Sequence, residues 1–317
     1  MTEPESAHGL SLLFDEDALA VFLADCWPEE RFVFHGDPSR FGAYGAVFEE
    51  EDVEKIIREV GRPVDVIGTD GFRVTCNDPG EAMDYHDHHG AMIYLTGLHR
   101  YPAVRELCDQ LSEDLRIPSR FVTCEGFAAR KGTRVPLHFD HETNFMIQLR
   151  GRKRWEVAEN DVLENPLFCY FPDKPDRFYR DGLDPYSGDL LNDRLPTDLE
   201  TFEAGPGTVT FLPRGTWHGT VSLDDSFSIG FVLDPPTLLE IAMSHLSREL
   251  HSNPRWRAHP LYPVREDGGY DRVFRHEVRS ILREISRTSG SGDADDAIND
   301  YRSSGPDDNT REYFVGS

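Results

Sequence analysis

Apolar residues recur at helical spacing in three stretches of the first 120 residues. Residues three or four apart lie on one face of a helix, so such a stripe predicts a helix with one buried side. The stripes lie within residues 14–26, 53–60 and 104–115. Proline or glycine, which end helices, follows each of them. We therefore expect three short helices, with a strand at 31–34 between the first two.

From Phe121 onwards the pattern changes to short runs rich in β-branched and aromatic residues, separated by glycine and proline. The predicted strands are 121–124, 135–138, 145–149, 154–157, 208–212, 220–223 and 227–233. Many short strands with turn residues between them are typical of a β-sandwich or barrel. We therefore expect a mainly β core over residues 121–235, preceded by a helix-and-strand region over 1–120 that packs on it. A polar stretch over 161–196 interrupts the strands, either as a lid or as a disordered surface insertion.

Helical spacing returns after the proline pair at 235–236, and it predicts two amphipathic helices within residues 236–285. Their apolar stripes are expected to pack on a second subunit, giving a homodimer, or to fold back onto the barrel of a monomer. Residues 286–317 are rich in Ser, Gly and Asp. This composition predicts a disordered acidic tail.

The charge balance indicates which kinds of partner the chain can bind, and the cysteines indicate its compartment. Lys and Arg number 33 and Asp and Glu number 58, a net charge of −25. Such a chain repels nucleic acid, and it suits a basic partner or simply a well-solvated surface. The five cysteines are scattered without a CxxC pair, which predicts no disulfide framework and fits the reducing cytoplasm. No apolar run approaches the ~20 residues of a membrane-spanning helix, and the acidic N-terminus predicts no secretory signal.

The triplet His138-Phe139-Asp140 lies at the end of a predicted strand and is the first candidate for metal binding. Residues i and i+2 of a strand point to the same side, so the imidazole of His138 and the carboxylate of Asp140 are expected to project together. A third ligand is expected from His218, which follows the predicted strand 208–212. Two histidines and one carboxylate on one face of a metal ion leave three positions open, a geometry that favours Fe(II) and an oxygenase reaction.

Two segments resemble the Jumonji-C hydroxylases, which are Fe(II)- and 2-oxoglutarate-dependent oxygenases on a double-stranded β-helix. They are VPLHFDHETNFMIQLRGRKRW over 135–155 and GPGTVTFLPRGTWH over 205–218. The chain is most similar to the cupin-like branch that contains the ribosomal oxygenases and the asparaginyl hydroxylase acting on hypoxia-inducible factor. The resemblance covers about residues 20–235. It implies a double-stranded β-helix (jelly-roll) barrel with flanking N-terminal helices and a C-terminal helical segment.

Carried over residue by residue, the resemblance implies that His138, Asp140 and His218 are the iron ligands. It also implies that Lys153, 15 residues after the first ligand, pairs with the distal carboxylate of 2-oxoglutarate. A fixed cation facing a carboxylate in a closed barrel gives a strong charge-assisted bond. Asn144 matches a position that in the asparaginyl hydroxylase helps to hold the same co-substrate.

The neighbours of that lysine, Arg152 and Arg154, alternate with it and should point to the opposite side of the strand. A register shifted by one residue would make them the candidates instead. The sequence also departs from the asparaginyl hydroxylase. Val135 stands where that enzyme has a threonine, and Ser228 and Gly230 are the nearest positions to a late asparagine of its last strand.

The resemblance implies hydroxylation of an amino-acid side chain in a protein or peptide, with release of succinate and CO2. The acidic surface makes a basic substrate plausible. A free amino acid or a peptide natural product is an alternative substrate. Lysine demethylation is an alternative reaction, and a metal-binding cupin module without catalysis is an alternative of a different class. A histidine cluster at 85–89 (YHDHH) is interpreted as a solvated loop that could line the mouth of the site, with a second metal site as the alternative.

Overall fold

Two antiparallel β-sheets form the centre of the computed structural model, which describes residues 8–42, 44, 53–60, 64–68, 73–172, 195–259, 272–288 and 294–303. The larger sheet has the order β1 (Phe32–His35), β10 (Thr208–Leu212), β7 (Thr143–Arg150), β12 (Ser226–Leu233), β5 (Val122–Ala129), β4 (Met92–Leu95), β2 (Val64–Ile67) and β3 (Arg73–Cys76). The smaller sheet has the order β6 (Arg134–His138), β11 (Trp217–Ser222), β8 (Lys153–Ala158) and β9 (Glu200–Ala204).

From β5 onwards the chain passes repeatedly between the two sheets, as a double-stranded β-helix does. Strands β5, β7, β10 and β12 belong to the larger sheet, and β6, β8, β9 and β11 belong to the smaller one. The mainly β fold predicted from the sequence is therefore confirmed. All eight predicted strands are present, although β11 begins at Trp217, three residues earlier than expected.

Four strands were not predicted, namely β2, β3, β4 and β9. Three of them, β2, β3 and β4, extend the larger sheet beyond β5. Each is only four or five residues long. Pairing with neighbouring strands, more than the sequence of the run itself, decides the conformation of such short strands.

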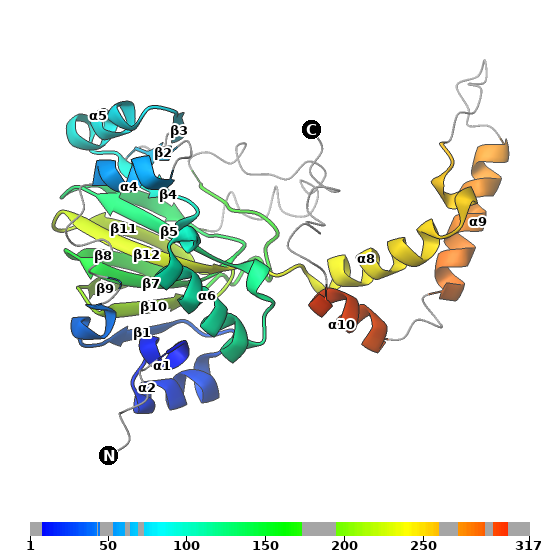
Figure 1. Cartoon of the computed structure of the whole chain (residues 1–317), viewed down its shortest axis with the longest axis horizontal. Helices are drawn as coiled ribbons and strands as arrows, with labels where there is room; N and C mark the ends of the chain where they lie inside the picture. The colour runs from blue at the N-terminus through cyan, green and yellow to red at the C-terminus, as the bar shows by residue number, and fades with distance from the viewer. Residues whose placement is uncertain are drawn as a thin grey trace. The chain divides into compact units, whose positions relative to one another are not determined.

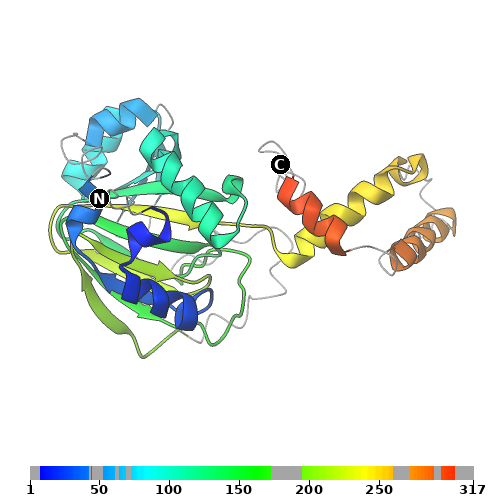
Figure 2. The ribbon, with the colours of Figure 1, turned by 60° about the horizontal axis from the view of Figure 1, so that its bottom comes forward.

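Helices of the N-terminal region cover one face of the larger sheet, as Figures 1 and 2 show for α6. The helices are α1 (Leu10–Leu13), α2 (Glu16–Val21), which continues as a π-helical turn over Phe22–Cys26, α4 (Val53–Val60), α5 (Pro79–His89) and α6 (Pro102–Leu115). Short 3-10 turns lie at Pro38–Phe41, Leu98–Arg100 and Ser119–Phe121. The three helices expected from the apolar stripes are thus present. Among the described residues, no helix is long and apolar enough to cross a membrane.

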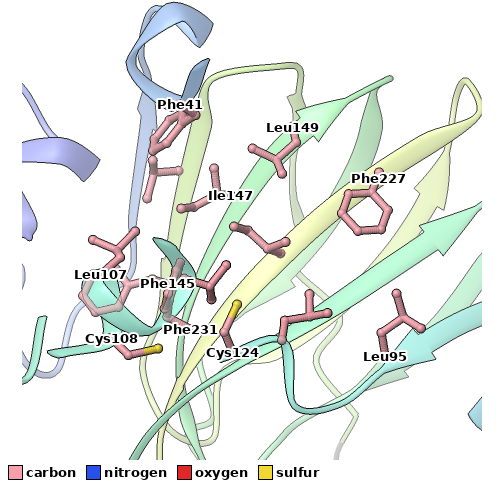
Figure 3. Close-up of a cluster of buried hydrophobic side chains, with 14 of the residues drawn as sticks. Phe41, Leu95, Leu107, Cys108, Cys124, Phe145, Ile147, Leu149, Phe227 and Phe231 are labelled. Atoms are coloured by element: carbon pink, nitrogen blue, oxygen red, sulfur yellow. The ribbon is translucent and has the colours of Figure 1, made fainter. Parts of the chain in front are cut away.

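The hydrophobic core lies between these helices and the larger sheet. Figure 3 shows Phe145 and Ile147 of β7, Phe231 of β12 and Leu107 of α6 in one cluster of buried side chains. Burying each such side chain stabilises the fold by about 1.5–3 kcal/mol relative to leaving it exposed. Alternate residues of these strands point the other way, and they supply the cavity described below.

Residues 235–317 form a second unit, separate from residues 1–234. It contains α8 (Leu238–His251), a 3-10 turn at Pro254–Arg257, α9 (Arg272–Thr288) and α10 (Ala294–Ser303). The two helices predicted there are present. Leu238 and Leu239 of α8 are 87% and 70% exposed, and Leu282 of α9 is 59% exposed.

The prediction of a disordered tail over 286–317 is wrong for residues 286–288, which end α9, and for residues 294–303, which form α10. Asp295 and Asp296 lie in its first turn, where the helix dipole favours negative charge. Asp300 accepts a hydrogen bond from His245 (2.8 Å) and forms an ion pair with Arg248 (2.9 Å), both on α8. Contacts between helices therefore order a segment whose composition alone suggested disorder. The predicted insertion at 161–196 lies mostly outside the described residues.

Candidate metal centre

His138, Asp140 and His218 meet at one end of the smaller sheet. One ligand atom from each lies within 4.8 Å of the others. The carboxylate Oδ2 of Asp140 is 3.9 Å from Nε2 of His138 and 3.4 Å from Nε2 of His218. Both histidines are buried. The structure brings these three residues together, as the sequence predicted.

Strand pairing explains why residues 80 positions apart converge. His138 ends β6 and lies directly opposite His218 of β11 in the antiparallel register, so their rings are 4.1 Å apart. Asp140 follows β6, and its backbone carbonyl accepts a hydrogen bond from the amide of Gly215 at 2.9 Å. The register shifts between His218 and Thr220. Such bulges re-aim side chains next to active sites.

The hydrogen bonds of the two imidazoles orient them for metal binding. Nδ1 of His138 lies 2.8 Å from the carbonyl oxygen of Pro136, and Nδ1 of His218 lies 2.9 Å from that of Thr216. A carbonyl only accepts, so Nδ1 carries the proton in both rings and Nε2 keeps its lone pair. Both Nε2 atoms face Asp140. This is how a metal-binding histidine is usually held by its surroundings.

Electrostatics keep His138 and Asp140 in the protonation states that a metal requires, whereas a metal ion would have to displace the proton that Asp140 favours on His218. Burial, together with the nearby His218, lowers the pKa of His138 to about 4. Burial alone would raise the pKa of Asp140, but the two imidazoles outweigh it and hold that pKa below its ordinary value. Burial alone would lower the pKa of His218, but the hydrogen bond and charge of Asp140 outweigh it and raise it. A neutral imidazole and a carboxylate are the forms that coordinate metals.

Lys153 lies in the same cavity as a buried cation. The residue is 3% exposed, and its Nζ donates a hydrogen bond to Oγ of Ser228 at 3.0 Å. Burial lowers its pKa to about 8. Among the described residues no carboxylate forms an ion pair with it. A buried ammonium group with one neutral hydrogen-bond partner is costly, so an anion is needed to complete this position.

The strand register predicted for β8 is confirmed by burial. Lys153 and Trp155 are buried, whereas Arg152 is exposed and pairs with Asp224 at 2.8 Å and with Glu203 at 3.6 Å.

A cavity of about 360 Å³ joins the three metal-binding candidates to the lysine. Both sheets line it, and Asn144, Val135 and Thr220 are among the lining residues. Asn144 is 9% exposed and lies on β7, opposite Leu212 of β10. The structure thus brings all five predicted site residues to one cavity. Their roles as ligands of iron and of a co-substrate stay predictions.

The cavity contains an acidic position that the sequence analysis missed. Glu125 of β5 and Tyr94 of β4 both line it, and the tyrosine hydroxyl donates a hydrogen bond to Oε1 of Glu125. Burial, reinforced by the charge of Asp140, raises the pKa of Glu125 to about 7. The predicted strand ended at residue 124. A single charged residue within the run VTCEGFAA was the signal that could have identified it.

A second group of possible ligands lies next to the first. Nδ1 of His141 is 3.2 Å from Sγ of Cys169 and 3.1 Å from Oε2 of Glu142. A hydrogen bond from Cys169 also contributes to the low pKa of Asp140. Cys169 of this second group therefore helps to stabilise the carboxylate of Asp140 in the first group.

The interpretation of residues 85–89 as a loop is wrong, because they form the last turns of α5. Asp78 caps the helix at its start and Gly90, with φ +62°, ends it. His86 is buried, with Nδ1 3.0 Å from the carbonyl oxygen of Ala91, while His88 and His89 are exposed. None of these histidines lines the cavity. The capping aspartate and the proline that follows it are a helix start signal that could have identified this helix.

Comparison with known proteins agrees with this geometry. The family model of the JmjC domain matches residues 102–241. An uncharacterized protein of Bacillus subtilis, YxbC, is 30% identical over 256 residues, which is 75% of this chain and 74% of that protein. The bifunctional lysine-specific demethylase and histidyl-hydroxylase NO66 of Drosophila pseudoobscura pseudoobscura is 25% identical over 71% of this chain, but the match spans only 22% of that longer protein.

Among solved structures, the ribosomal oxygenase YcfD of Escherichia coli has the same fold. It aligns with a TM-score of 0.51 over 84% of this chain and 66% of that one, at 17% sequence identity. This likeness concerns the fold alone.

Proposed function

This chain belongs to the JmjC-domain family, and we propose that it is an Fe(II)- and 2-oxoglutarate-dependent dioxygenase that hydroxylates an amino-acid side chain in a protein or peptide. The observation that carries the proposal is one cavity holding both a two-histidine, one-carboxylate centre and a buried cation that no described carboxylate neutralises. The first suits Fe(II) and the second suits the far carboxylate of 2-oxoglutarate.

The donor set fits a metal ion with open coordination positions. His138, Asp140 and His218 would hold Fe(II), and the remaining positions would stay available for the co-substrate and dioxygen. When bound, iron and 2-oxoglutarate supply the oxidation of an unactivated C–H bond by dioxygen, with release of succinate and CO2.

The residues of this chain would orient the metal ligands, bind the co-substrate and exclude water from the site. The carbonyl groups of Pro136 and Thr216 fix the two imidazoles, so their Nε2 atoms need no reorientation. Lys153 would receive the far carboxylate of 2-oxoglutarate, with Ser228 fixing the ammonium group and Asn144 as a further contact. Because these groups are buried between two sheets, water does not screen the bond between the ammonium group and the carboxylate.

Two observations favour a protein or peptide substrate. Curated relatives include proteins named as histidyl-hydroxylase and as lysine-specific demethylases, whose names denote amino-acid residues as targets. The net charge of −25 favours association with basic partners. We therefore propose a basic protein or peptide, with a free amino acid or peptide natural product as the alternative.

The oligomeric state and compartment are also proposals. Apolar side chains exposed on the C-terminal helices, among them Leu239 and Leu282, would pair with those of a second copy in a homodimer. Light scattering of the purified chain, with Leu239→Glu as the variant, tests this pairing. All five cysteines are free thiols, which favours the reducing cytoplasm.

Anaerobic absorption spectroscopy tests the catalytic proposal. Titration of the metal-free protein with Fe(II) and then 2-oxoglutarate should give a weak visible charge-transfer band. His138→Ala should abolish the band, whereas His88→Ala, a change at an exposed histidine of α5, should leave it unchanged. Iron binding without a band, and without succinate on admission of air, would favour a non-catalytic cupin module instead. Formaldehyde release with a methylated peptide would indicate demethylation.

A further inference from the structure

The cavity-facing side of the larger sheet carries a row of polar and aromatic residues that the proposed reaction does not use. Along β5 the side chains alternate, so that Cys124 is buried in the core while Glu125 and Phe127 line the cavity. Tyr94 on the neighbouring strand β4 lies opposite Phe127 and also lines the cavity. Arg73 of β3 completes the row, with its guanidinium 5.2 Å from the centre of the Tyr94 ring.

The cations of this cavity are already engaged elsewhere. Arg73 forms an ion pair with Asp65, with Nε donating to Oδ2 at 2.8 Å. Lys153 of the other sheet donates to Ser228. Of the residues that the structure describes, none places a cationic group within ion-pair distance of Glu125, whose partner is the Tyr94 hydroxyl. The charge of Arg73 favours the ionised Glu125 from beyond ion-pair distance but does not outweigh burial, so a carboxylate in this position is incompletely compensated.

We propose that Glu125, held by Tyr94, is the binding site for a cationic side chain of the substrate, a guanidinium or an ammonium group. This inference rests on the function proposed above, which it refines by naming the substrate class and the residue that selects it.

Charge and space both support a cation at this position. The carboxylates of Glu125, Asp140 and Glu142 line one cavity. The charges of Fe(II) and Lys153 would be balanced by Asp140 and the two carboxylates of 2-oxoglutarate, so Glu125 and Glu142 leave an excess of negative charge for an incoming group. The cavity of about 360 Å³ lies within the usual range of small-molecule sites, so a side chain can enter beside the co-substrate. A planar guanidinium pairs with a carboxylate through two parallel hydrogen bonds, and an ammonium group pairs as a point charge.

The hydrogen bond from Tyr94 would position the carboxylate. It occupies one oxygen of Glu125 and leaves the other for the substrate. A bound cation would offset the desolvation that raises the pKa of Glu125, so it would favour the ionised carboxylate in the buried site. An uncharged side chain of the same shape would not offset the desolvation of the carboxylate. The site should therefore bind charged side chains more tightly than uncharged ones.

Capture of peptides by the whole protein tests this inference without requiring turnover. Four pools of peptides with random flanks carry arginine, lysine, citrulline or norleucine at the central position. The protein, immobilised with Fe(II) and 2-oxoglutarate under anaerobic conditions, is incubated with all four and washed in ~0.5 M salt to screen its surface charge. Mass spectrometry then counts the recovered peptides.

The wild-type protein should enrich the arginine or lysine pool at least about tenfold over citrulline and norleucine, the size of one charge-assisted hydrogen bond. Comparison of the arginine and lysine pools distinguishes the two cations. Glu125→Gln should remove this preference, and Tyr94→Phe should reduce it. Glu203→Gln removes one exposed surface carboxylate and should not change it, which controls for net charge.

Equal recovery of the four pools by the wild type, including no recovery of any, overturns the inference. So does an unchanged preference in Glu125→Gln. The charge-transfer band, recorded on the same preparations, separates the two proposals. If the band forms but the pools are recovered equally, only the substrate site is refuted. If the band does not form, the catalytic proposal fails. Thermal unfolding of each variant confirms that it is folded.

Discussion

Replacing Lys153 with methionine should make the protein more stable while removing its affinity for 2-oxoglutarate. Methionine is about as long as lysine but carries no charge. In the protein without co-substrate, the ammonium group of Lys153 is buried, and among the described residues it donates a hydrogen bond to Ser228 and lies 5.9 Å from the centre of the Phe127 ring. Its charge therefore opposes folding until a carboxylate arrives.

The size of this effect follows from the pKa of Lys153. Burial lowers it from the usual 10.5 to about 8. At ~1.4 kcal/mol for each pH unit, the difference corresponds to about 3 kcal/mol of lost stability at pH 7. Loss of the hydrogen bond to Ser228 lowers the stability of the variant by about 1 kcal/mol. The net gain of about 2 kcal/mol should raise the midpoint of thermal unfolding by roughly 4–8 °C for a unit of this size.

The pH dependence has a definite sign. Because the pKa of Lys153 is lower in the folded protein than in the unfolded chain, the wild type is penalised below about pH 8. The penalty shrinks as pH rises through 8 towards 10.5, where the unfolded chain also loses its proton. The stability difference between Lys153→Met and the wild type should therefore fall to less than about 1 kcal/mol near pH 10.

Affinity for 2-oxoglutarate should change in the opposite direction. A carboxylate left in a buried site without its cation costs about 3–5 kcal/mol, so the dissociation constant should rise at least about 100-fold. Denaturant unfolding at pH 7 and pH 10 measures the stability, and the charge-transfer band measures the dissociation constant. Arg152→Met, at the exposed neighbour, is the control. A destabilised Lys153→Met that still binds 2-oxoglutarate with wild-type affinity would refute the reasoning.

Three further predictions test other parts of the structure. Ser228→Ala removes the hydrogen bond to Lys153 and should weaken 2-oxoglutarate binding by roughly 2–10-fold in the same titration. Asp140→Ala removes the only carboxylate of the candidate triad, so Fe(II) binding measured by calorimetry should fall at least about 100-fold; binding within a few-fold of wild type would contradict the triad. Gly151→Ala should lower the free energy of unfolding by at least about 1–3 kcal/mol, because Gly151 has φ +64° and a Cβ would lie 2.2 Å from the carbonyl oxygen of Asp225; a denaturant midpoint equal to that of the wild type would show that the turn relaxes freely.

The sequence alone determined the elements that carry strong local signals. The apolar stripes of α4, α6 and α8 identified those helices, because apolar residues at a period of 3.6 over two or more turns line up on one face only when the segment is helical. Alternation predicted that Arg152 points away from Lys153, and the family resemblance, not the alternation, implied that Lys153 faces the site. The HxD spacing and the distal histidine likewise named the three residues that the fold brings together.

Only the tertiary structure decided the features that depend on pairing between distant segments. Strands β2, β3 and β4 were not predicted from the sequence, yet their place beside β5 puts Tyr94 against Glu125 and Arg73 over Tyr94. Helix α10 exists because Asp300 finds partners on α8. In each case the stabilising contact comes from residues far away in the chain. A local pattern names the chemistry of a side chain, but the register of the sheet decides which side chains share a cavity.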